Sequence, residues 1–115
     1  MYGAESIIGT KGNAFRFNGV DNYIDIPNHP DFNGLTQFTV SCWFKIDGFD
    51  IWEPILNKGG YDEYVTDVFE VNVNNEGLIH FVLNFESSGR TGYNSPSGQL
   101  TTGSWYHFIG TWDWK

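Results

Sequence analysis

Short runs in which apolar and polar residues alternate recur along the chain, separated by clusters of Gly, Asn, Asp and Pro. Alternation with a period of two is typical of β-strands that bury one face, and such clusters are typical of turns. Nowhere does the apolar spacing match a sustained helix. The pattern predicts strands at residues 14–17, 23–26, 38–46, 55–56, 68–73, 78–85 and 104–112.

The run at residues 38–46 is the clearest of these strands, because five apolar residues share one face. We expect that face to be fully buried, and Trp43 on the opposite face indicates that this second face is covered in part as well. The clearest hairpin joins residues 68–73 to residues 78–85 through an Asn-Asn-Glu-Gly turn. Its two apolar rows are expected to pair side by side.

Composition agrees with a β-protein. Aromatic residues make up 18% of the 115 residues, whereas Ala, the strongest helix former, occurs only at Ala4 and Ala14. A chain of this length forms one domain, here residues 1–115. The predicted fold class is therefore all-β, an antiparallel β-sandwich of two packed sheets.

Charge narrows the range of partners. Six Lys and Arg residues against fourteen Asp and Glu residues give a formal net charge of −8. A surface that follows nucleic-acid phosphates or binds anionic lipid needs clustered cations, so neither partner is expected. No run approaches the roughly 20 apolar residues that cross a bilayer, so no membrane insertion is expected, and residues 1–12 lack the features of a secretory signal. Cys42 is the sole cysteine, which excludes an intrachain disulfide.

Three motifs, in this order, resemble those of laminin G-like domains in the concanavalin A-like lectin/glucanase superfamily. They are AFRFNGVDNYI at residues 14–24, FTVSCWFK at 38–45 and GSWYHFIGTWD at 103–113. The resemblance implies a concanavalin A-like jelly roll. In the family, further strands follow the third motif, so we expect a domain that is incomplete at its C-terminal end. Uncovered strand edges would then favour self-association or completion by another chain.

Glycoside hydrolases of this superfamily carry paired carboxylates on one strand face, which retaining hydrolysis requires. The nearest approach in this sequence is Glu63, Asp67 and Glu70. Asp67 and Glu70 are separated by an odd number of residues, so they point to opposite faces of a regular strand. We expect these acids to be solvated and the protein to be no enzyme, with a degenerate glycoside hydrolase relative as one alternative.

Binding needs exposed aromatic side chains beside polar ones, because sugar rings stack on aromatic planes. The predicted loops at residues 48–67 and 89–98 supply such side chains at the rim of the sandwich, where function tends to lie. The candidate ligand-binding residues are Trp52, Tyr61, Asp62, Tyr64, Tyr93 and Asn94. A non-catalytic module that recognises carbohydrate is the leading interpretation, and a structural or adhesive domain that binds protein is the alternative. Equally, these aromatics can pack their loops onto the sheet.

The resemblance also implies calcium, because related domains hold this ion at a loop. Asn18 and Asp21 lie in the matching turn and carry the hard oxygen ligands that calcium prefers. The alternative is that Asn18 and Gly19 shape the turn and Asp21 caps it. The resemblance further implies an extracellular or cell-surface location as part of a larger protein.

Overall fold

The computed structural model describes residues 1–59, 68–85 and 89–113. Its eight strands and one short 3-10 helix are β1 (Glu5–Ile8), β2 (Asn13–Arg16), η1 (Pro30–Phe32), β3 (Gln37–Lys45), β4 (Glu53–Lys58), β5 (Val68–Val73), β6 (Ile79–Phe85), β7 (Gly89–Asn94) and β8 (Trp105–Asp113). All strand pairs are antiparallel. The predicted all-β class is confirmed.

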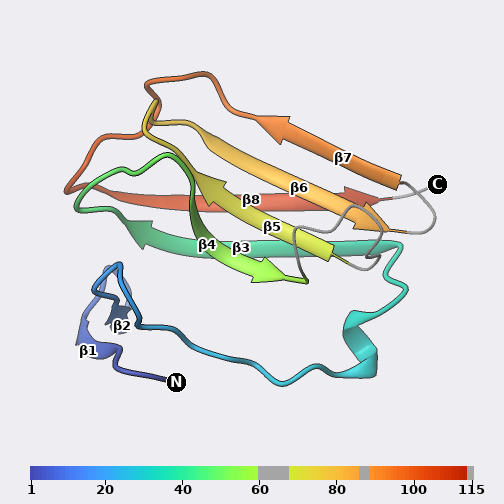
Figure 1. The fold of residues 1–115 in the computed structure, drawn as a ribbon, viewed down its shortest axis with the longest axis horizontal. Helices are drawn as coiled ribbons and strands as arrows, with labels where there is room; N and C mark the ends of the chain where they lie inside the picture. The colour runs from blue at the N-terminus through green and yellow to red at the C-terminus, as the bar shows by residue number, and fades with distance from the viewer. Residues whose placement is uncertain (60–67, 86–88, 114–115) are drawn as a thin grey trace.

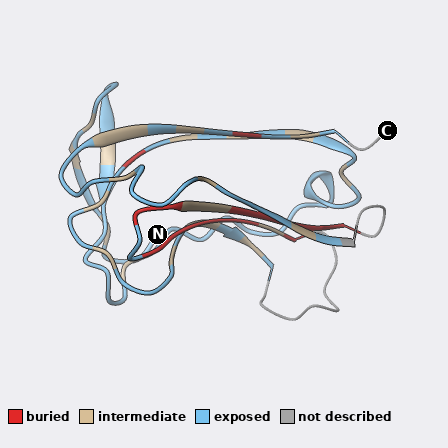
Figure 2. Ribbon diagram, turned by 90° about the horizontal axis from the view of Figure 1, so that it is seen from above, coloured by how far each residue is buried: buried red, intermediate tan, exposed pale blue. Residues whose placement is uncertain are grey.

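The strands form two packed layers, as Figures 1 and 2 show. One layer is a four-stranded sheet in the order β4-β5-β6-β7, and the other is the pair β3-β8. The hairpin of β1 and β2 is a separate two-stranded sheet at one end of the sandwich. The wider sheet therefore extends beyond the two strands that face it.

The core lies between the layers and consists of alternate residues of β5 and β6. Val71, Phe81, Leu83 and Phe85 form its buried centre. Phe38 of β3 reaches across, and its ring centroid lies 5.2 Å from that of Phe69 and 5.6 Å from that of Phe85. The other residues of β5 and β6 therefore point away from β3 and β8, onto the outer face of the four-stranded sheet.

The predicted hairpin is confirmed in its register. Val71 lies opposite Phe81 and Phe69 lies opposite Leu83, so the two apolar rows are adjacent. Gly77 closes the turn with a positive φ of 67°. A Cβ atom built on Gly77 would lie 2.7 Å from the carbonyl oxygen of Leu100, so both the backbone angle and the close approach require glycine.

Several predicted elements are wrong. Residues 23–26 form no strand, and Tyr23 makes only an isolated bridge to Tyr2, whose ring it stacks on at 5.7 Å. The predicted loop at residues 89–98 instead begins with β7, which lacks an apolar row because it is an edge strand. β1 is likewise a strand that the alternation did not predict. Short edge strands bury little, so they need no alternating pattern.

The outer face of β3 and β8 is more exposed to solvent than we expected from the presence of Trp43 there. Trp43 stacks on His107 of β8 at 4.8 Å, yet 43% of its surface is exposed. The Oγ atom of Ser41 lies 2.9 Å from Nε2 of the same imidazole. In addition, only Phe44 among the inward residues of β3 is fully buried, because two strands cannot enclose them from the sides.

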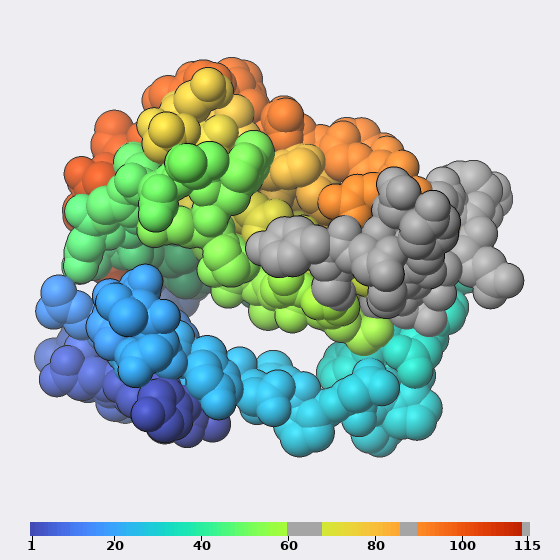
Figure 3. Space-filling view, in the orientation of Figure 1, coloured from blue at the N-terminus to red at the C-terminus, as the bar shows by residue number. Residues whose placement is uncertain are grey.

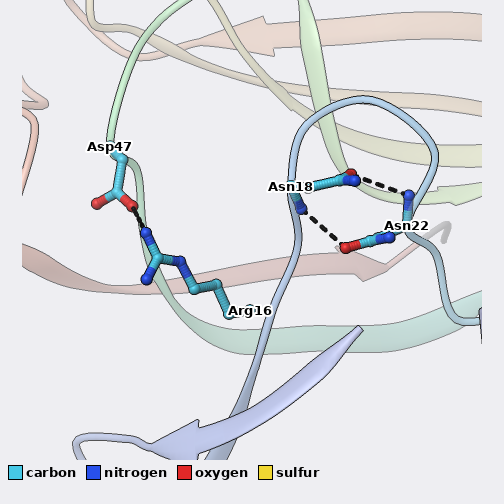
Figure 4. Close-up of polar contacts among 4 residues, drawn as sticks. All are labelled: Arg16, Asn18, Asn22 and Asp47. Carbon is cyan, nitrogen blue, oxygen red and sulfur yellow. Dashed lines mark hydrogen bonds and ion pairs between the residues drawn. The ribbon is translucent and has the colours of Figure 1, made fainter. Parts of the chain in front are cut away.

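The N-terminal residues run along one side of the sandwich, with an open gap over part of their course (Figure 3). An ion pair of 3.4 Å joins Arg16 of β2 to Asp47, just after β3 (Figure 4). Both side chains are mostly exposed, so this contact contributes little to stability. In the described part of the chain, no helix has the length and apolar character needed to cross a membrane.

Candidate functional site

The outer face of the four-stranded sheet carries a row of polar side chains. Register places Glu70 opposite Val82 and Asn72 opposite His80, on the face away from the core. Arg90 of β7 continues the row beside Asn84 of β6. β-strands place alternate residues on one face, so the same alternation that builds the core aligns these polar groups.

Glu70 is the unusual member of this row, because only 1% of its surface is exposed. The expectation that this acid is solvated on a strand exterior is therefore wrong. Its Oε2 atom accepts a hydrogen bond of 3.2 Å from Nδ2 of Asn72, which is also buried. Its Oε1 atom is buried as well and has no hydrogen-bond partner. Burying a carboxylate is costly unless it is hydrogen-bonded, so the bond from Asn72 stabilises Glu70 at this position.

Trp52 stands next to this row, in the residues that lead into β4. Its ring centroid lies 5.4 Å from the His80 ring at an interplanar angle of 50°, and 49% of its surface is exposed. Gly92 of β7 leaves space for the imidazole, since a Cβ atom at this position would lie 2.6 Å from Nε2 of His80. A glycine on the edge strand thus leaves room for the His80 ring beside the indole.

Burial lowers the pKa of His80 below its usual value of 6.5, and the positive charge of Arg90 lowers it further. The negative charge of Glu70 acts in the opposite direction but is the weakest of the three influences. The imidazole is therefore predominantly neutral at pH 7, with one ring nitrogen able to donate a hydrogen bond and the other able to accept one.

These groups surround a cavity of about 220 Å³. Its lining consists of Trp52, Glu70, Asn72, His80, Val82 and Arg90. Pockets for drug-sized ligands measure about 300–1,000 Å³, so this one fits a single ring-sized group. An aromatic plane above an acid, an amide, an imidazole and a guanidinium offers both stacking and hydrogen bonds to a polar ligand.

The predicted ligand-binding residues do not all meet at this cavity. Tyr93 and Asn94 end β7, and both line a second, mainly apolar cavity of about 370 Å³ between β6, β7 and β8. Tyr93 lies opposite Phe81, which places it on the core side of the sheet and apart from Trp52. Tyr61, Asp62 and Tyr64 lie outside the described residues, as do Glu63 and Asp67 of the hydrolase interpretation.

The turn proposed for calcium is organised by hydrogen bonds of its own. Oδ1 of Asn18 accepts bonds from the backbone N–H groups of Val20, Asp21 and Asn22, and the backbone N–H of Asn18 donates to Oδ1 of Asn22. Figure 4 shows the two bonds between Asn18 and Asn22. Oδ1 of Asp21 accepts from the side-chain amides of Asn18 and Asn22. These bonds are the ones by which Asn18 and Asp21 would shape and cap the turn, as the alternative interpretation expects.

The described residues contain no group of three or more His, Cys, Asp or Glu side chains placed to hold a metal ion. These side chains therefore add no further ligand to Asn18 and Asp21. Calcium binding at this turn stays a prediction.

Sequence reasoning missed Glu70, Asn72, His80 and Arg90 as members of one site. The sequence did contain a signal for part of this site. Glu70 and Asn72 lie on the same face of a predicted strand, and this face is opposite to the strand's apolar row. The predicted hairpin register also brings His80 next to Asn72. The burial of Glu70 could not be read from alternation, which normally assigns such a face to solvent.

Comparison with known families gives one finding. A laminin G-type family model, described as the concanavalin A-like lectin/glucanases superfamily, matches residues 18–115. This match covers most of the chain and includes every strand from β3 to β8, whereas β1 and β2 lie before it. No curated protein and no solved structure matches the chain.

Proposed function

Because the chain belongs to the concanavalin A-like lectin/glucanases superfamily, whose laminin G-like domains are generally non-catalytic binding modules, we propose that it is a carbohydrate-binding module. The observation that carries the proposal is the half-exposed indole of Trp52 above a cavity lined by polar side chains. The proposal includes no catalytic step. An extracellular or cell-surface location within a larger protein, which the resemblance implies, belongs to the same proposal.

The chemistry of the cavity supports this ligand class. A sugar ring presents apolar C–H groups on its faces and hydroxyl groups around its edge. The Trp52 ring can stack on such a face, while the His80 imidazole and the Arg90 guanidinium can form hydrogen bonds with hydroxyl groups at the edge. The cavity volume of about 220 Å³ fits one ring of a chain, with neighbouring rings lying outside it.

The Trp52→Ala variant tests the proposal on a glycan array. We expect it to lose binding by at least about 30-fold, as central aromatic contacts do when truncated. Trp43→Ala is the matched control, because Trp43 is similarly exposed beside a histidine but lies on the other sheet. A blank array with a folded wild-type protein, or equal losses in both variants, would contradict the proposal.

The same array, run with calcium and with a chelator, tests the calcium prediction. Glycan binding that requires calcium and is lost in Asp21→Ala would support a metal site at this turn. Binding that is equal in both buffers would remove calcium from the proposal and leave the Trp52 site in place.

A structural or adhesive domain that binds protein is the second candidate. Among the described residues no strand pairs with the second edge of β8, and an apolar cavity lies between this edge and β7. Unpaired strand edges template pairing with another chain, so self-association or completion by a partner strand is the expected form of such binding.

A further inference from the structure

Arg90 is the one Lys or Arg side chain that lines the cavity beside Trp52. It lies on the edge strand β7 and is exposed to solvent. The ion pairs between described residues join Arg16 to Asp47 and His29 to Asp31, so neither involves Arg90. A guanidinium group keeps its positive charge and presents five N–H donors in one plane. In the described structure these donors are open to a ligand.

The acid of the cavity leaves this cation available. Glu70 is buried and accepts a hydrogen bond from Asn72, so a ligand that enters the cavity meets Arg90 rather than the carboxylate. Burial is the largest cause of the lowered pKa of His80, the positive charge of Arg90 is the second, and the opposing charge of Glu70 is the weakest. At this imidazole the influence of the cation therefore exceeds that of the acid, which favours a ligand group with negative charge.

The form of the guanidinium group selects among anions. It binds a carboxylate through two parallel N–H···O bonds, because both groups are planar and their spacing matches. The half-exposed indole of Trp52 lines the same cavity and offers a plane for a sugar ring. A uronate ring has both features that these two side chains recognise, a face of C–H groups and a carboxylate at its edge.

Resting on the proposed carbohydrate-binding function, we propose that Arg90 determines specificity and that the cavity takes a uronate ring, whose carboxylate pairs with the guanidinium group while the ring stacks on Trp52. Densely sulfated glycans are disfavoured. They need clustered cations, whereas the chain has a net charge of −8 and a single Lys or Arg side chain among the residues that line the cavity.

Matched neutral and acidic oligosaccharides test this specificity. Galacto-oligosaccharides are compared with galacturono-oligosaccharides and with sulfated galacto-oligosaccharides, and xylo-oligosaccharides are compared with their glucuronate-bearing forms. We expect isothermal titration calorimetry to give at least about tenfold tighter binding for each uronate probe than for its neutral counterpart, as charge-assisted hydrogen bonds provide. Binding of both kinds should depend on Trp52. The preference for uronate should narrow as salt is added, because Arg90 is exposed and its charge is screened.

Two variants separate the charge of Arg90 from its planar form. Arg90→Gln removes the charge, and we expect it to abolish the preference for uronate while neutral probes bind nearly as they do to wild type, since the amide still donates hydrogen bonds. Arg90→Lys keeps the charge without the planar set of donors, so it should retain only part of the preference. Arg16→Gln is the matched control, because it makes the same charge change on β2, outside the cavity lining. It is expected to keep the full preference.

The outcomes separate this inference from the function on which it rests. Neutral probes that bind wild-type protein as tightly as uronate probes would overturn the role of Arg90 while carbohydrate binding stands. An unchanged preference in Arg90→Gln, or an equal loss of preference in Arg16→Gln, would do the same. Tighter binding of sulfated than of uronate probes would overturn the assignment of the carboxylate. If no probe binds in a manner that depends on Trp52, the proposed function itself fails. The comparison on wild-type protein decides the question even if a variant does not fold.

Discussion

At the scale of single residues, Gly92 shows how the absence of a side chain shapes the cavity. The space above it holds the imidazole of His80, which in turn contacts the indole of Trp52. The backbone at Gly92 does not have a positive φ, so alanine meets no conformational strain there. The three heavy atoms nearest to an added methyl group all belong to the histidine ring.

Gly92→Ala should therefore displace His80 without unfolding the protein. We expect glycan affinity to fall on the order of tenfold, comparable to the loss of one strong hydrogen bond, with an unchanged melting temperature. Isothermal titration calorimetry with the strongest array ligand measures the affinity, and differential scanning calorimetry measures the melting temperature. Gly48→Ala is the control, since nothing lies within 4 Å of its added Cβ atom. Full affinity in Gly92→Ala would exclude His80 from the site.

At the scale of the strands, the two sheets bury their aromatic and aliphatic residues to different extents. Leu83 of β6 is completely buried in the core, whereas Trp43 of β3 packs on one side against His107 and meets solvent on the other. The cost of truncation follows the contacts that are lost rather than the size of the side chain.

Leu83→Ala should destabilise the fold by about 2–5 kcal/mol, because it leaves a cavity in the core. Trp43→Ala should cost only about 0.5–1.5 kcal/mol, the range of a single aromatic pair. Urea unfolding of both variants and of the wild type measures these changes in the free energy of unfolding. An equal loss of stability in the two variants would mean that the outer face of β3 and β8 is covered after all.

The accuracy of prediction from sequence differs among these strands for a physical reason. β5 and β6 are central and bury one face, so the alternating rows around Val71 and Phe81 predicted their bounds to within one residue, and also their register. β7 is an edge strand with two glycines in six residues, and its sequence, GRTGYN, has no apolar row to detect. Trp52 was named as a candidate from its loop position and aromaticity. The burial of Glu70, by contrast, depends on the packing of the whole sheet, which the alternation of one strand does not show.

At the scale of the whole molecule, the four-stranded sheet overhangs the β3-β8 pair, and this mismatch leaves the second edge of β8 uncovered in the described structure. The exposed side chain of Ile109 lies on this strand and lines the apolar cavity beside β7. A lysine at such a position is a common natural protection against edge pairing.

Self-association should therefore depend on Ile109. We expect wild-type protein to associate as its concentration rises, and Ile109→Lys to remain monomeric, as measured by sedimentation velocity. Val20→Lys, which places the same charge on an exposed apolar position outside the sandwich strands, is expected to associate like wild type. A monodisperse monomer of wild-type protein at high concentration would remove the self-association hypothesis.

The pairing of β3 with β8 also determines the order in which the chain can fold. Gln37 lies opposite Asp113, and a side-chain hydrogen bond of 2.9 Å joins these residues across 76 positions of sequence. All strands of the wider sheet lie between them, and β5, β6 and β7 are joined by short connections. Contacts that close long loops form late, because their entropic cost must be met first. During synthesis the apolar row of β3 therefore emerges long before its partner strand β8. Until β8 is made, the β5-β6-β7 meander is the surface against which this row can pack.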